Sequence, residues 1–328
     1  MKIGIILRAV LLAVLSLTGG AAKTADEPLT VEAKIPLGHV AGRIDHLASD
    51  TKRNRLLVAE LGNNSVGVID LTAQKVLKRI TGLREPQGIA YEPRADRVYI
   101  ANAGDGVVKT FAAETLSPIG EVKLGEDADN IRLGGSDRIF VGYGDGSIAV
   151  LQAGKKVLDL PLNAHPESFQ LDAEHGRLFV NEPEAHGIAV IDEKTGRLRA
   201  KWGVRGLSGN FPMALDATSH RLFVVYRSPA TLAVFDMTNG NLLSRLPICG
   251  DADDVFFDAK RNQLYVSCGE GLVSVVSAAD QRFAEIGRVR TRIGARTSLF
   301  VPELDRLFVA VRANAGQPAE IWVLRPRS

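Results

Sequence analysis

The chain has 328 residues and a formal net charge of +2, with 40 Lys and Arg residues against 38 Asp and Glu. This length is enough for one large core or for two domains. The near-neutral charge and the low aromatic content, 6%, argue against nucleic-acid binding, which relies on a basic surface and on aromatic stacking platforms.

The first 22 residues are predicted to be a secretory signal peptide outside the fold. Lys2 precedes a short apolar run, residues 3–17, which Arg8 interrupts, and small residues follow up to Ala22. A charged start, a short apolar stretch and small residues at the cleavage site are typical of such signals. The apolar run is too short to predict a membrane span. We therefore expect cleavage near Ala22, a single mature domain over 23–328 with no membrane span, and a periplasmic or secreted location.

A four-residue motif recurs seven times along the rest of the chain. Each copy has Arg or Gln followed by three apolar residues, as in Arg-Leu-Phe-Val, and successive copies begin 39 to 44 residues apart. Regular spacing of this kind indicates a repeat architecture. The copies begin at Arg55, Arg97, Arg138, Arg177, Arg221, Gln263 and Arg306.

Each motif lies among three other short runs separated by turn residues. In one repeat an apolar run at 169–172 precedes the motif, a second follows at 188–192, and a more polar run follows at 198–202. Turns such as 144–146 contain Gly, which supplies the positive φ that tight hairpins need. Paired-helix repeats share this period, but no segment keeps a 3.6-residue apolar pattern for three turns. The unit therefore predicts a four-stranded propeller blade.

The last repeat lacks a fourth strand because the chain ends soon after its third run, 320–324. The segment 29–35 near the N-terminus has the pattern of the missing strand. Pairing it into the last blade would close the ring and cover both open sheet edges. We therefore expect an all-β, seven-bladed β-propeller; an open array, or a ring of six or eight blades, is the alternative.

The repeats resemble the YncE-like, YVTN-type β-propeller family over nearly all of the mature chain. The resemblance implies an exported seven-bladed propeller, and it implies no settled activity because propellers serve unrelated functions. It is carried by the segments 68–70, 97–102 and 190–192 and by the more distinctive stretches 42–47, 249–254 and 268–271.

Two sets of polar residues are predicted to gather at one mouth of the central channel. In a blade the innermost strand begins on the face where the second strand ends, so equivalent positions from all blades converge there. The first set, just before the innermost strands, is Asp45, His46, Gln87, Asp129, Asn130, Glu167, Asp253, Asp254 and Arg296. The second set, after the recurring motif, is Glu60, Asn102, Tyr143, Asn181, Tyr226 and Arg312.

Converging carboxylates suit several chemistries. Asp45, Asp129 and Asp253 are candidate metal ligands, since oxygen donors favour Ca²⁺ and an added imidazole, such as that of His46, suits Zn²⁺. Crowding raises carboxyl pKa values, which would let Glu167 or His46 transfer protons. The competing interpretation is a set of mutually satisfied polar groups around a water-filled channel.

Cys249 and Cys268 are 19 residues apart and are expected at the same mouth. In an oxidising compartment a disulfide is the favoured interpretation, with a pair of soft metal ligands as the alternative. No Cys-x-x-Cys-His sequence is present, so covalent c-type haem is not supported.

The sequence leaves two hypotheses of function. The first is a non-catalytic module that binds a small ligand, a peptide or a periplasmic protein at the channel mouth. The second is a divalent-cation-dependent hydrolase or lyase of the lactonase-like propeller type. No residue is assigned a catalytic role from the sequence.

Overall fold

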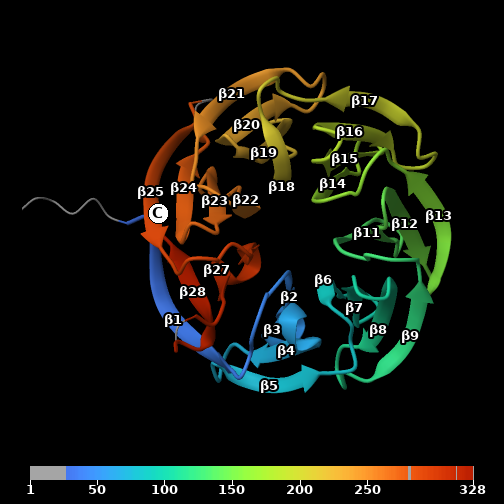
Figure 1. The fold of residues 1–328 in the computed structure, drawn as a ribbon, viewed down its shortest axis with the longest axis vertical. Coiled ribbons are helices and arrows are strands. Elements are labelled where there is room, and N and C mark those ends of the chain that lie inside the picture. The colour runs from blue at the N-terminus through green and yellow to red at the C-terminus, as the bar shows by residue number, and fades with distance from the viewer. Residues whose placement is uncertain (1–26, 280–281, 315, 328) are drawn as a thin grey trace, which may run out of the picture.

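Seven four-stranded antiparallel sheets form a ring in the computed structural model, which describes residues 27–279, 282–314 and 316–327 (Figure 1). The seven-bladed β-propeller predicted from the repeat is thus confirmed. The predicted signal peptide, residues 1–22, lies outside the described residues. Within those residues, no helix has the length and apolar character needed to cross a membrane.

Each blade runs from an innermost strand at the channel to an outermost strand at the rim of the ring (Figure 1). The first three blades are β2 (Leu47–Asp50), β3 (Arg55–Glu60), β4 (Ser65–Asp70) and β5 (Lys75–Ile80); β6 (Pro86–Glu92), β7 (Arg97–Asn102), β8 (Val107–Ala112) and β9 (Pro118–Lys123); and β10 (Ile131–Leu133), β11 (Ile139–Tyr143), β12 (Ser147–Gln152) and β13 (Lys155–Pro161).

The next three blades are β14 (Phe169–Asp172), β15 (Arg177–Glu182), β16 (Gly187–Asp192) and β17 (Leu198–Trp202); β18 (Ser208–Asp216), β19 (Arg221–Ser228), β20 (Ala230–Asp236) and β21 (Leu242–Pro247); and β22 (Ala252–Asp258), β23 (Gln263–Cys268), β24 (Leu272–Ser277) and β25 (Ala284–Arg290). The seventh contains β26 (Ser298–Val301), β27 (Arg306–Val311), β28 (Ala319–Pro326) and β1 (Leu29–Gly38). Short 3₁₀ turns are η1 (Thr51–Arg53), η2 (Leu61–Asn63) and η4 (Pro302–Leu304).

The turn before the recurring motif has the same left-handed backbone in every blade. Most side chains avoid this region, but Gly, Asn and Asp tolerate it. In five of the blades the innermost strand ends in an acid that fixes this turn. For example, Asp216 accepts a hydrogen bond from the backbone N–H of Ser219 and pairs with Arg221 at 2.7 Å. The left-handed residues, with φ between 50 and 58°, are Asn54, Asp96, Asp137, Gly176, His220, Asn262 and Asp305.

The apolar core is divided into seven clusters, one at each interface between neighbouring blades. Between the fifth and sixth blades, for example, Phe223 and Val225 pack with Val255 and Val266. Each blade face is therefore buried only by the next blade, and the ring is stable only when every interface is complete.

The interface that closes the ring depends on β1. This strand pairs antiparallel with β28, with Leu29 opposite Pro326 and Ile35 opposite Ile321. In Figure 1 the blue N-terminal strand lies beside the red C-terminal strand at the rim. The predicted strand at 29–35 is confirmed and extends to Gly38, because Leu37 also packs into the closing interface.

Substitution of Ile35 by alanine is expected to destabilise the ring by about 2–5 kcal/mol, the usual cost of truncating a fully buried isoleucine. The Ile35 side chain is only 1% exposed, whereas Ile119 on the outermost strand β9 is 52% exposed. Ile119→Ala is therefore the matched control and should cost less than about 0.5 kcal/mol. Urea unfolding of both variants measures the difference; equal losses would contradict the closing role of β1.

Candidate functional site

A polar cavity of about 630 Å³ opens at one end of the channel, and all seven blades contribute to its wall. We call it the mouth cavity. Every residue of the first predicted set lies in this wall, as the repeat geometry required. These residues are Asp45, His46, Gln87, Asp129, Asn130, Glu167, Asp253, Asp254 and Arg296.

Backbone pairing holds these residues at the mouth. The N–H of Asp45 donates to Ala59 O at 2.8 Å, and the N–H of Asp129 donates to Gly142 O at 2.9 Å. These bonds extend the ladder between the innermost and second strands beyond the start of the innermost strand. Gly88 allows the Asp129 backbone to pack closely, since a Cβ there would lie 1.9 Å from Asp129 O. Hydrogen bonds and close packing therefore hold the backbone that carries these carboxylates.

The second predicted set does not line the mouth cavity. Glu60 is fully buried and accepts hydrogen bonds from Ser65 Oγ at 2.5 Å and Arg79 Nε at 2.9 Å. The Asn181 amide donates to Phe211 O at 2.9 Å and accepts from Asn210 Nδ2 at 3.0 Å. The second strand of a blade lies one step farther from the axis, so these side chains bind within blades or between them.

Three of the four remaining members of the second set also make hydrogen bonds to residues outside the mouth cavity. Asn102 Oδ1 accepts from the backbone N–H of Arg84, and Tyr143 Oη donates to Asp159. Arg312 Nε donates to Gly294 O. Tyr226 is buried, and its hydroxyl has no hydrogen-bond partner among the described residues. None of these four residues lines the mouth cavity, so the structure does not bring them together with the first set.

Three donors in the mouth cavity lie close enough to share one ion: Asp45, His46 and Asp129 have ligand atoms within 4.8 Å of one another. His46 Nε2 lies 3.7 Å from Asp45 Oδ1 and 3.6 Å from Asp129 Oδ1. Burial lowers the pKa of His46, but the carboxylates of Asp129 and Asp45 outweigh it and raise that pKa to about 10. Burial raises the pKa of Asp45, while His46 opposes the rise.

Asp253, the third carboxylate predicted as a metal ligand, is held by two arginines instead. Its carboxylate pairs with the Arg227 guanidinium and with Arg296 Nε at 2.9 Å. Arg296 also pairs with Asp251 at 2.8 Å. One side of the mouth cavity is therefore neutralised by ion pairs within the protein.

Two further carboxyl groups of the wall hold protons near neutral pH. Burial and the charge of Asp129 raise the pKa of Glu167 to about 7. Burial likewise raises the pKa of Asp254 to about 7, although His46 and the N–H of Ser298 favour its ionised form. Proton transfer at physiological pH needs groups tuned in this way.

The mouth cavity also includes charged residues outside the predicted sets. Asp145 lies in the turn between the second and third strands of its blade, and Glu184 occupies the equivalent turn one blade on. This turn lies on the mouth face in every blade, so charged residues in it could have been predicted from the repeat as residues of the mouth. Arg43 and Asp127 are further charged residues outside the predicted sets, and His165 and Arg227, which neighbour the predicted Glu167 and Tyr226 in sequence, also lie in the wall.

A second cavity of about 330 Å³ continues down the channel between the innermost strands. It shares His46, Ser168 and Asp254 with the mouth cavity, so these three residues form the floor between the two. Arg132 lies in the wall of this channel cavity and donates to Ile131 O at 2.9 Å. Burial lowers the Arg132 pKa, against the charges of nearby carboxylates.

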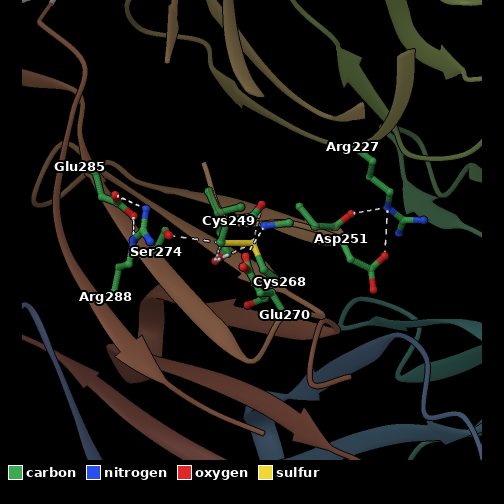
Figure 2. The surroundings of a disulfide bond; sticks show 12 residues. Arg227, Cys249, Asp251, Cys268, Glu270, Ser274, Glu285 and Arg288 are labelled. Atoms are coloured by element: carbon green, nitrogen blue, oxygen red, sulfur yellow. Dashed lines mark hydrogen bonds and ion pairs between the residues drawn. A yellow bond between two sulfur atoms is a disulfide. The ribbon is translucent and has the colours of Figure 1, made fainter. Parts of the chain in front are cut away.

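The predicted disulfide is present between Cys249 and Cys268, whose Cα atoms are 5.9 Å apart. It ties the loop before β22 to the end of β23. Figure 2 shows the bond beside Asp251, which points toward Arg227. The backbone O of Asp251 also accepts from the N–H of Gly269 at 2.8 Å. The disulfide thus braces the segment that carries the arginine-paired acids.

The fold and the mouth cavity define the class: a seven-bladed β-propeller with an acidic site at one end of its channel. Among solved structures, the chain is similar to one described as Kuenenia stuttgartiensis hydrazine synthase. The TM-score is 0.72 at 17% sequence identity, covering 90% of this chain and 95% of that chain. This likeness shows the fold alone. No protein-family model and no curated protein matches the chain.

The free-thiol content of the denatured, unreduced protein is expected to be zero, since both cysteines are bonded. Reduction should lower the free energy of unfolding by about 2–4 kcal/mol. Urea unfolding with and without dithiothreitol measures this loss, and a variant with both cysteines replaced by serine should not respond to the reductant. Two titratable thiols in the unreduced protein would rule out the bond.

Stability is expected to fall with rising pH because of Glu167. The pKa of Glu167 rises from its ordinary value of 4.5 to about 7 on folding. Between pH 4.5 and about pH 7, the unfolded chain has therefore released a proton that the folded protein keeps. A raised carboxyl pKa therefore costs stability progressively across that window. The free energy of unfolding of Glu167→Gln minus that of the parent should therefore be larger at pH 8 than at pH 4.5. Glu184→Gln, at an exposed acid of the same wall, is the control; the same difference at both pH values for Glu167→Gln would refute the raised pKa.

Proposed function

We propose that this protein is an exported binding module that holds a small polar ligand in the mouth cavity. The supporting observation is the cavity itself, which gathers charged and polar side chains from all seven blades into about 630 Å³. Ligand sites for small molecules usually have volumes of about 300–1,000 Å³ and a few convergent polar groups. A channel that only held water would not need this many ionisable groups on one end.

The charge of the wall selects the ligand class. Eight acidic side chains line the mouth cavity, against three guanidinium groups and the imidazoles of His46 and His165. Arg227 and Arg296 are already paired with Asp253, so the opposite side, with Asp127, Asp129 and Glu167, keeps an excess of acid. An acidic cleft concentrates cations and repels phosphates. We therefore propose a ligand that carries a positive group, such as an amine, and not a nucleic acid.

Export is part of the proposal. The disulfide between Cys249 and Cys268 supports it, since such bonds persist in oxidising compartments. The charged and apolar pattern of residues 1–22 has the character of a secretory signal. The resemblance to YncE-like, YVTN-type propellers implies the same location, periplasmic or secreted.

A divalent-cation-dependent hydrolase or lyase is the second candidate, and Glu167 favours it. Its pKa of about 7 lets the group hold or release a proton at neutral pH, as a general acid or base must. The two candidates differ in the fate of the ligand, which a binding module returns unchanged and an enzyme converts to product.

Blocking the cavity should abolish ligand binding. Gln87 lies in the cavity wall, so Gln87→Trp places a bulky ring in the ligand volume. We expect at least one member of a panel of small amines, amino acids and dipeptides to raise the melting temperature of the parent protein. The Gln87→Trp variant should not show that shift, because ligands stabilise only the state that binds them.

The matched control is Gln152→Trp, since Gln152 is exposed at the far end of β12, away from the mouth. The panel is run in buffer with EDTA and again with Zn²⁺, and mass spectrometry of the recovered ligand separates binding from turnover. No shift from any compound under both conditions, or an equal shift in Gln87→Trp, would remove the proposed site.

A further inference from the structure

We propose that Asp45, His46 and Asp129 form a binding site for one divalent transition-metal ion, of the Zn²⁺ class, at the floor of the mouth cavity. This inference rests on the proposed function, because it names an ion bound beside the organic ligand in the same cavity. The three residues come from the first and third blades, so the packing of three successive blades around the channel brings them together.

The spacing of the donors fits an ion of this size. Two ligand atoms at the usual zinc distance in a tetrahedral site lie about 3.3 Å apart. His46 Nε2 is 3.7 Å from Asp45 Oδ1 and 3.6 Å from Asp129 Oδ1, and all three ligand atoms lie within 4.8 Å of one another. The two pairs that include His46 need to close by only a few tenths of an ångström, and the two carboxylate oxygens by at most about 1.5 Å, to reach the spacing of a tetrahedral site.

Asp129 gives a second observation that points to a bound ion. Its Oδ1 atom is buried and makes no hydrogen bond among the described residues, and its 3.6 Å contact with His46 Nε2 is to another of the proposed ligands. The residue as a whole is only 7% exposed. Burying a carboxylate oxygen without a partner is costly unless a cation or a donor satisfies it. The oxygen faces the imidazole of His46 and Asp45, which is where a shared ion would lie.

The protein holds two of the three ligands by contacts outside the cluster. Arg43 Nη2 donates to Asp45 Oδ2 at 2.7 Å, which leaves Oδ1 facing His46. The close approach of Gly88 fixes the backbone of Asp129. Outer contacts of this kind orient metal ligands in proteins and keep them in place before the metal arrives.

The donor set selects the class of ion. One imidazole nitrogen with two carboxylate oxygens suits Zn²⁺ and similar transition ions, whereas Ca²⁺ takes six to eight oxygens and seldom an imidazole. Asp253, the acid that would add oxygen donors, is engaged by Arg227 and Arg296. Three protein ligands beside an open cavity leave a position for water or a ligand atom, as in zinc sites that act on small molecules.

Metal content and affinity test the site directly. The mature protein, carrying a purification tag without histidine, is loaded with Zn²⁺, passed over a desalting column and analysed for metal, and calorimetry gives the Kd. We expect one zinc per chain. Asp129→Asn and His46→Gln should each bind more than about 100-fold more weakly, since even outer contacts of metal ligands are worth 10–100-fold.

Matched controls separate this site from general acidity. Glu184→Gln changes an exposed acid of the same wall that is not among the acids assigned to the ligand, and His165→Gln changes the other cavity histidine. Neither belongs to the three-donor group, so both should keep zinc affinity within about threefold. Bound Co²⁺ should give a visible absorption band in the parent and both controls, and lose it in His46→Gln.

Each outcome decides the proposal. No zinc above a buffer blank in the parent protein, or equal loss in the controls, would overturn it. Circular dichroism and melting temperature confirm that the near-isosteric Asp129→Asn variant folds; a folded variant that keeps full zinc affinity would also overturn it. The protein could fail to bind zinc while an organic ligand still raises its melting temperature in EDTA. That result would reject the metal site and leave the proposed binding function unaffected.

Discussion

Closure of the ring is the constraint on which the rest of this structure depends. Each apolar cluster lies between two blades and neither blade can bury it alone, so an open end would expose a whole sheet face. β1 supplies the outermost strand of the last blade and contributes Ile35 and Leu37 to the closing interface. The ring arrangement also brings Asp45 close to Asp129, although their blades are separated in sequence by a complete repeat.

The electrostatics of the mouth follow from that geometry. Carboxylates placed before innermost strands converge on one small volume, where burial and mutual repulsion favour protonation. The protein offsets part of this cost with Arg227 and Arg296, which neutralise Asp253. On the other side His46 lies between Asp45 and Asp129. Glu167 makes no direct ion pair among the described residues, although the charge of Arg227 favours its ionised form. The site is thus asymmetric, with a neutralised side and an acidic one.

The sequence predicted the fold and the first set of mouth residues because both follow from a fixed offset within a repeat. It did not place the second set, since repeat spacing gives the height of a residue along the axis and not its distance from that axis. Within the first set, the spacing does not give the direction in which each side chain turns, because local irregularities of the backbone set it. A bulge between Ala252 and Asp254 turns Asp253 toward the arginines and Asp254 toward Ser298, and no residue pattern predicts that turn.

The charge of the channel wall changes along the channel axis, and the change occurs at the floor of the mouth cavity. Above His46, Ser168 and Asp254 the wall is rich in carboxylates, and below them Arg132 lies among mostly apolar residues of the innermost strands. Because charges act strongly across a low-dielectric interior, Arg132 stabilises the ionised form of Asp254 from beneath. Under the proposed function, a cation would be attracted to the mouth and repelled from the channel below it, and we therefore expect a bound positive group at the floor.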